Sequence, residues 1–196
     1  MSRAEAPPTD PHPTDPRPAG PPPWRWLTAT DPDVVHALLT SCDAHQAATS
    51  GTPAPARRPE TTRRLVESGA VHLLHHTTGP AGMFTLTERP PTGTDETVFP
   101  PAERPLYLSR LAVAPAWLTA GALVGVRCVR RAVEVATDRG GDVLRAQVNP
   151  DLRDTCALLA LLGFTPCGPT FDDGAGRRHA HLHRPLRPAA AEPGRD

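Results

Sequence analysis

The sequence predicts an α/β (α+β) fold, in which a mixed sheet of six to seven strands is flanked by about four helices. Two patterns alternate along the chain: apolar residues at helical spacings of three and four, and short apolar runs bounded by turn residues. Their order is helix, helix, hairpin, strand, helix, strand, helix, hairpin. The chain has 196 residues, of which 38% are hydrophobic, so it has enough apolar side chains to form one core. The sequence contains no internal repeat.

Composition places the domain between two tails. Residues 1–23 hold nine of the 26 prolines and almost no large apolar side chain, so they cannot bury enough surface to offset the cost of ordering. We therefore expect a disordered proline-rich arm over 1–23, a single domain over 24–186 and a second disordered tail over 187–196.

The first half of the domain predicts two helices and a hairpin. Thr30 or Asp31 caps a first helix that runs to about residue 48, with Pro32 in its first turn. A second helix covers 59–69 and ends at a glycine. Two strand-like runs then surround Gly-Pro-Ala-Gly at 79–82, which we expect to be the hairpin turn.

The second half predicts strands and helices in alternation. Residues 89–105 are proline-rich and polar, which indicates a long irregular connection. The sequence then predicts, in order, a strand at 105–115, a helix at 121–138, a strand at 142–148, a helix at 151–163, and two strands joined by Asp-Asp-Gly-Ala-Gly.

Charge and cysteine usage exclude several classes of function. The 21 basic residues balance 21 acidic ones, so we expect no nucleic-acid partner and no membrane partner. Every basic residue except histidine is arginine, which rules out a lysine base or Schiff base. The four cysteines contain no CxxC pair, and the start of the chain lacks the apolar core of a signal peptide. These features favour a cytoplasmic protein.

Three stretches together resemble the GNAT superfamily of acyl-CoA-dependent N-acyltransferases. "LYLSRLAVAP" is similar to the central strand that leads into the family's pyrophosphate loop, "VLRAQVNPD" to the next strand, and "LLALLGFTPCG" to the helix end that follows. The resemblance covers about residues 24–186. It implies a twisted sheet that splays between its two central strands and holds acetyl-CoA there as co-substrate, and an acetyl group that passes directly to the primary amine of a small-molecule or peptide acceptor.

The resemblance also implies where the cofactor binds. The pantetheine arm would follow the central strand, and the phosphates would meet backbone N–H groups at the start of the next helix, where small residues permit close approach. Alternatively, the glycines only allow tight helix packing and the arginines only face solvent. The family's glycine loop can be aligned in two ways, and each has one mismatch. In the first, Leu123 occupies a position that is small in the family. In the second, Ala120 occupies the position of the family's Arg or Gln. The candidate cofactor-binding residues are Leu111, Ala112, Val113, Ala120, Gly121, Ala122, Leu123, Val124, Gly125, Arg127 and Asn149.

The family's usual acid and base are missing from their positions. Leu159 stands where many relatives have a tyrosine that protonates the leaving thiolate, and Arg110 stands where many have a glutamate that acts as base. The candidate stand-ins are Ser109, Tyr107, Glu88 and Cys156. The alternative is a catalytically degenerate GNAT-fold module that binds acyl-CoA or a protein partner as a regulator.

Two further patterns bear on ligands. His179, His181 and His183 share one face of a strand, but no carboxylate or cysteine follows at ligand spacing, so we expect no metal site. The resemblance implies that the acceptor enters near the first two helices and the segment 44–61, which has no acidic cluster and so does not suggest a polycationic acceptor. Homodimers are common in the family, so the resemblance also suggests a homodimer.

Overall fold

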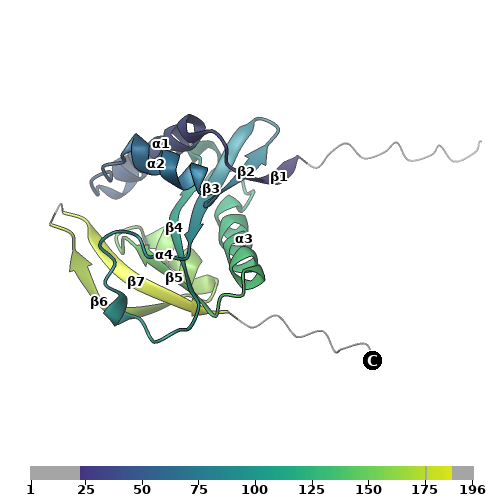
Figure 1. Cartoon of the computed structure of the whole chain (residues 1–196). Coiled ribbons are helices and arrows are strands. Elements are labelled where there is room, and N and C mark those ends of the chain that lie inside the picture. Colours follow the sequence, from purple (N-terminus) through teal and green to yellow (C-terminus); the bar gives the residue numbers. More distant parts are fainter. Residues whose placement is uncertain (1–22, 175, 187–196) are drawn as a thin grey trace, which may run out of the picture.

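The computed structural model describes residues 23–174 and 176–186, which form a seven-stranded mixed sheet in the order β1-β2-β3-β4-β5-β7-β6 (Figure 1). All neighbouring strands are antiparallel except β4 and β5. The α/β prediction of six to seven strands and about four helices is therefore confirmed. The predicted arm and tail lie, except for Pro23, outside the described residues. The strands are β1 (Trp24–Thr28), β2 (Val71–His76), β3 (Gly79–Thr87), β4 (Pro105–Val113), β5 (Val143–Val148), β6 (Thr165–Asp172) and β7 (Arg178–Pro185).

Within the described residues, four α-helices cover the sheet. Of the two predicted caps of α1, Thr30 and Asp31, the structure has Asp31, whose carboxylate accepts from the backbone N–H groups of Asp33 and Val34. The helix ends at Gly51, which adopts the left-handed conformation (φ 68°). The helices are α1 (Pro32–Ser50), α2 (Pro59–Glu67), α3 (Val124–Asp138) and α4 (Arg153–Leu161), and short 3₁₀ turns lie at Glu96–Val98 and Pro115–Trp117.

Alternation along the strands divides the core between the two faces of the sheet. On β3, Met83 packs with α1 and α2, whereas its neighbour Phe84 packs with α3. Leu73 and Leu74 on β2 divide in the same way. Figure 1 shows the result: α1 and α2 lie together over one part of the sheet, and α3 lies apart from them.

The hairpin between β2 and β3 differs from the predicted one. His76 pairs with Gly79, so the turn is Thr77-Thr78, and the Gly-Pro-Ala-Gly stretch belongs to β3. The prediction of a turn at 79–82 was wrong because cross-strand pairing overrides the local signal. Pro80, which has no N–H to donate, lies next to the bulge at Ala81, where the β2–β3 register shifts.

β4 and β5 separate partway along their length. They pair from Pro105–Leu108 against Val143–Ala146, and beyond Leu108 β4 has no partner on that side. A bulge in β4 accompanies the separation, since Ser109 pairs with Thr85 and Ala112 with Met83, so that two residues of β4 oppose one of β3. Arg110, inside the bulge, has a φ of 52°. The splay implied by the resemblance is present.

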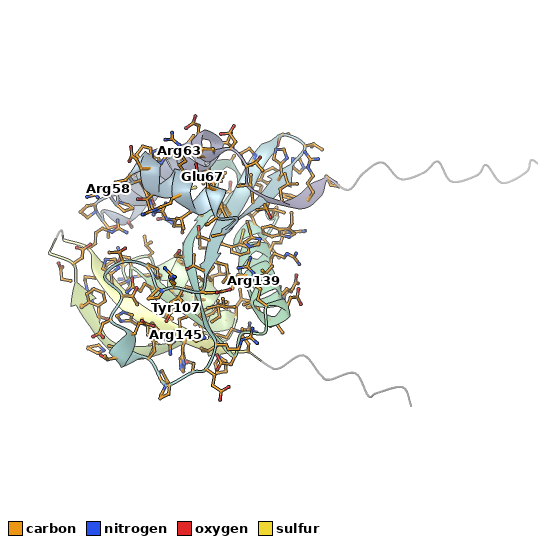
Figure 2. All side chains as sticks on the ribbon, viewed as in Figure 1. Arg58, Arg63, Glu67, Tyr107, Arg139 and Arg145 are labelled. Carbon is orange, nitrogen blue, oxygen red and sulfur yellow. The ribbon has the colours of Figure 1, made fainter. Side chains whose placement is uncertain are left out.

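A buried arginine fastens the irregular segment 88–104 to the sheet. Arg145 on β5, 5% exposed, donates to the Tyr107 hydroxyl at 2.9 Å and to the Pro100 carbonyl at 2.8 Å. Its guanidinium also lies over the ring of Phe99, and the Tyr107 hydroxyl donates in turn to the carboxylate of Glu96. Figure 2 shows Tyr107 and Arg145 side by side. The segment is therefore held to the sheet by polar contacts as well as by apolar packing.

The pH dependence of stability should include a contribution from His72 on β2. Its ring stacks on Phe84, and burial, followed by the charges of Arg139 and Arg131, lowers its pKa from 6.5 to about 4. Because the unfolded chain takes up this proton at a higher pH than the folded chain, stability falls as pH falls from about 7 towards 4. Between pH 7.5 and 5, the free energy of unfolding should fall in both proteins. We expect the fall to be smaller in His72→Phe than in the wild type, by on the order of 1 kcal/mol. Urea unfolding at both pH values measures the difference, and parallel losses would contradict it.

Within the described residues, we find no helix whose length and apolar character would let it cross a membrane.

Candidate functional site

A large cleft opens where β4 leaves β5. Its volume is about 1140 Å³, and it runs between the C-terminal half of α1, the end of β4, the segment that enters α3, and the start of α4. Side chains from four separate parts of the chain therefore meet around it. The lining residues are Cys42, His45, Gln46, Thr49, Ser50, Thr52, Leu111, Val113, Trp117, Leu118, Thr119, Gly121, Leu123, Val124, Gly125, Val126, Asp151, Leu152, Arg153, Asp154, Thr155 and Leu158.

The start of α3 presents unpaired backbone N–H groups to this cleft. Gly121 (φ 65°) and Leu123 (φ 50°) are both left-handed, so the helix starts at Val124 and not at the predicted residue 121. No side chain caps it, and its first i to i−4 bond runs from Arg127 N to Leu123 O at 2.9 Å. The N–H groups of Val124, Gly125 and Val126 thus have no helical acceptor, and the helix dipole adds positive potential there. An anion fits this position.

The two glycines of this segment have different roles. A Cβ placed on Gly121 would meet nothing within 4 Å, so this residue borders open space. A Cβ on Gly125 would lie 3.0 Å from Leu158 Cδ2 on α4. Gly125 therefore serves close packing of α3 against α4, as in the alternative interpretation, while Gly121 leaves the cleft open.

The structure brings together some of the predicted cofactor-binding residues. Leu111, Val113, Gly121, Leu123, Val124 and Gly125 line the cleft. Ala112 is buried on the α1–α2 side, Ala120 is exposed, and Ala122 packs against the core on the α3 side. Asn149 is buried, and its Oδ1 accepts from the backbone N–H of Asp151, which borders the cleft.

The arginine that lines the cleft is not the expected one, and two acidic residues, Asp151 and Asp154, line the cleft beside it. Arg127 donates through Nε to the Ala122 carbonyl at 3.0 Å, and its guanidinium lies 5.3 Å from the ring centre of Trp24, so it does not line the cleft. Arg153, in the first turn of α4, does line it. Sequence reasoning missed Arg153, because nothing local to α4 indicates that its first turn faces the start of α3.

Replacing Leu123 by glycine should stabilise the protein. The leucine side chain is 67% exposed, while the residue's φ of 50° is a conformation that a branched side chain rarely adopts. We expect Leu123→Gly to raise the free energy of unfolding by about 0.5–1 kcal/mol and to preserve or strengthen acetyl-CoA binding. Urea denaturation and calorimetric titration measure the two effects. A loss of stability would mean that the exposed leucine makes a contact worth more than its strain.

The four candidate catalytic residues lie in different places. Ser109 lies at the bulge of β4, on the splayed end of the strand. The Tyr107 hydroxyl is engaged by Arg145 and Glu96, and burial raises its pKa. Glu88 lies near the opposite end of β4, beside a small separate cavity of about 270 Å³. The thiol of Cys156 donates to the Asn149 carbonyl at 3.6 Å, and burial raises its pKa. Of the four, Ser109 is the one placed at the splay.

A further cysteine, which the sequence did not single out, lines the cleft. The thiol of Cys42 on α1 donates to the carbonyl of Val113 at 3.1 Å. Burial, then the charge of Asp43, raises its pKa to about 11. It is therefore a protonated thiol that holds α1 against the end of β4, not a thiolate nucleophile.

On the α1–α2 side, charged contacts hold the surrounding segments together. Arg57 forms a bidentate ion pair with the buried carboxylate of Asp43, through Nε at 2.6 Å and Nη2 at 2.8 Å. Arg177, beyond the β6 strand, donates to the carbonyl of Pro53 in the α1–α2 connection. Two remote loops, one of which belongs to the segment predicted to admit the acceptor, thus meet beside the splay.

The strand histidines do not gather as ligands. His181 is 2% exposed, shares a hydrogen bond of 3.0 Å with Gln147 and stacks on Phe171, while His179 lies 3.1 Å from Asp173. Among residues 23–174 and 176–186, no three His, Cys, Asp or Glu side chains are placed to hold a metal ion.

Comparison with known proteins gives matches in structure alone. No family model matches the chain, and no curated protein matches its sequence. A GNAT-family acetyltransferase from Streptococcus agalactiae has a TM-score of 0.66 at 13% identity, over 84% of this chain and 96% of its own. A putative acetyltransferase from Salmonella typhimurium, solved with acetyl-CoA, has a TM-score of 0.59 at 15% identity, over 87% of this chain and 98% of its own. The ribosomal-protein-alanine N-acetyltransferase from Brucella melitensis has a TM-score of 0.59 at 19% identity, over 83% of this chain and 99% of its own.

Proposed function

We propose that this chain, which has the fold of the GNAT acetyltransferases, transfers an acetyl group from acetyl-CoA to the primary amine of an acceptor. The observation that carries the proposal is the cleft itself. It joins an uncapped helix N-terminus at one end to a splayed, unpaired strand edge at the other. A long thioester with a pyrophosphate at its far end matches that combination.

At the helix end, the pyrophosphate would accept from the free N–H groups of Val124, Gly125 and Val126. The open space at Gly121 leaves room for it, and Arg153 supplies a charged side chain on the opposite wall. The acetyl-CoA bound to the Salmonella typhimurium neighbour supports the assignment of this ligand class.

At the strand end, the pantetheine arm would lie along β4 beyond Leu108. The edge of the strand has no β5 partner there, so its backbone groups, apart from the Val113 carbonyl that accepts from the Cys42 thiol, would be available to the two amides of the arm. Leu111 and Val113 line the cleft beside it with apolar surface. The thioester would then lie near the bulge at Ser109 and Arg110.

The proposed reaction is direct attack. The neutral amine nitrogen bonds to the thioester carbonyl carbon, the C–S bond breaks, and the proton lost by nitrogen passes, directly or through water, to the departing CoA thiolate. Ser109 is the candidate to relay it. Orientation and backbone donors to the oxyanion supply the larger part of the rate, and general acid–base help adds typically 10²–10⁴-fold. The absent tyrosine and glutamate therefore make the reaction slower without preventing it.

Titration of acetyl-CoA into the purified protein, followed by CoA-thiol release with a panel of amines, tests the proposal. We expect micromolar binding and release of thiol that requires an amine. Binding without release for any amine would contradict the transferase and favour an acyl-CoA-binding module. Absence of binding would overturn the assignment of the cleft.

A further inference from the structure

Arg110 lies at the bulge of β4, next to Leu111, which lines the cleft. It occupies the bulge of β4 with a φ of 52°, at the point where β4 loses β5. Its guanidinium reaches α2, where Nη1 donates to Thr62 Oγ1 at 3.3 Å. It is therefore on the α1–α2 side of the sheet, away from the start of α3, and the cofactor phosphates would not lie next to it.

The positive charge of Arg110 is not neutralised by the residues around it. Within the described chain, its one hydrogen bond is to the uncharged hydroxyl of Thr62, and no carboxylate lies within 4 Å. The nearby carboxylate of Asp43 is already bound by both arms of Arg57. Burial, and then the charge of Arg57, lowers the pKa of Arg110, and the opposing effect of the Asp43 carboxylate is too small to reverse the shift.

The other arginines with a structural role on this side of the sheet have protein partners for their guanidinium groups. Arg57 has Asp43, and Arg145 has the Tyr107 hydroxyl, the Pro100 carbonyl and the ring of Phe99. Arg110 has most of its N–H donors unused, although it is half-buried. Withdrawing a guanidinium from water without a counter-charge is costly, and a planar carboxylate that accepts two N–H bonds offsets that cost best.

We propose that Arg110 binds a carboxylate of the acceptor, so that the acceptor is a small amino acid-like molecule with a free carboxylate near its amine. The inference rests on the proposed function, because that function places the thioester beside the β4 bulge. A carboxylate held by Arg110 fixes the acceptor on the α1–α2 side of the thioester. The same charge discourages a cationic acceptor.

The test compares L-amino acids with their carboxamides as acceptors, at saturating acetyl-CoA, by CoA-thiol release. We expect the wild type to favour the carboxylates in kcat/KM. In Arg110→Gln we expect the ratio of carboxylate to carboxamide to fall 10- to 100-fold, with acetyl-CoA affinity within twofold of wild type. Comparing ratios between variants cancels the different basicities of the two sets of amines. Arg110→Lys, which keeps the charge, should keep part of the preference.

Arg63→Gln is the matched control. It makes the same change of charge on α2, next to Thr62, but Arg63 is exposed (Figure 2). Its ratio should equal that of the wild type, and thermal denaturation confirms that each variant is folded.

The outcomes separate the two proposals. A folded Arg110→Gln with an unchanged ratio overturns the role of Arg110 and leaves the transferase intact. If neither set is acetylated while another amine of the panel is, the carboxylate assignment fails and the transferase stands. Acetyl-CoA binding with no thiol release for any amine overturns both.

Discussion

Replacing Gly121 by glutamate should lower the affinity for acetyl-CoA at least 100-fold. The new side chain would point into open space, because nothing lies within 4 Å of a Cβ there, and its carboxylate would meet the pyrophosphate at the start of α3. Two like charges about 5 Å apart repel by about 3 kcal/mol at an effective dielectric constant of 20, which corresponds to more than 100-fold. Calorimetric titration of acetyl-CoA measures the loss.

Two controls separate charge from strain. Gly121→Gln has the same left-handed backbone to satisfy (φ 65°) without the charge, so most of the affinity should return. Gly93→Glu places the same side chain at another left-handed glycine with open space (φ 83°), in the connection before β4, and should bind as wild type does. A folded Gly121→Glu with full affinity would show that the phosphates bind elsewhere.

The parts of the fold that the sequence predicts well are those whose signals are local. A cap at Thr30 or Asp31 and a strand at 105–115 are readable from a few adjacent residues. The structure has the cap at Asp31 and the strand over Pro105–Val113. β1 was missed because "WRWLT" is only five residues long and becomes a strand by pairing with the open edge of β2. The turn at Thr77-Thr78 was misplaced for the same reason, since pairing between strands outweighed a Gly-Pro signal.

The residues of the candidate site likewise divide into those that a local motif indicates and those that packing brings in. Leu111 to Gly125 is one continuous stretch, so a motif can indicate it as a unit. The opposite walls come from α1 and α4, about 70 residues before and 30 after, and their contribution depends on how the layers pack. No spacing in the sequence could reveal that Arg153 enters the cleft, that Arg127 turns towards Trp24, or that Arg110 lacks a counter-charge.

Packing also couples the middle of the sheet to the proposed phosphate site, and Gly82→Ala should expose that coupling. A Cβ on Gly82 of β3 would lie 2.6 Å from Val124 Cγ1, 3.0 Å from Cys128 Sγ and 3.1 Å from the Ala112 carbonyl oxygen. Since Val124 is the first residue of α3, relief of the contact must move the helix start outward. We expect a loss of about 2 kcal/mol in the free energy of unfolding, and weaker acetyl-CoA binding.

A double-mutant cycle with Val124→Ala identifies the contact responsible. Val124 is 2% exposed, so Val124→Ala alone should cost about 2 kcal/mol through the cavity it leaves. In the double variant the alanine at position 82 fills part of that cavity, and the combined loss should be smaller than the sum by at least about 1 kcal/mol. Urea denaturation gives all four stabilities, and acetyl-CoA affinity should recover together with stability. Additive losses would mean that α3 shifts freely over β3, in which case the geometry of the phosphate site would not depend on the glycine beneath it.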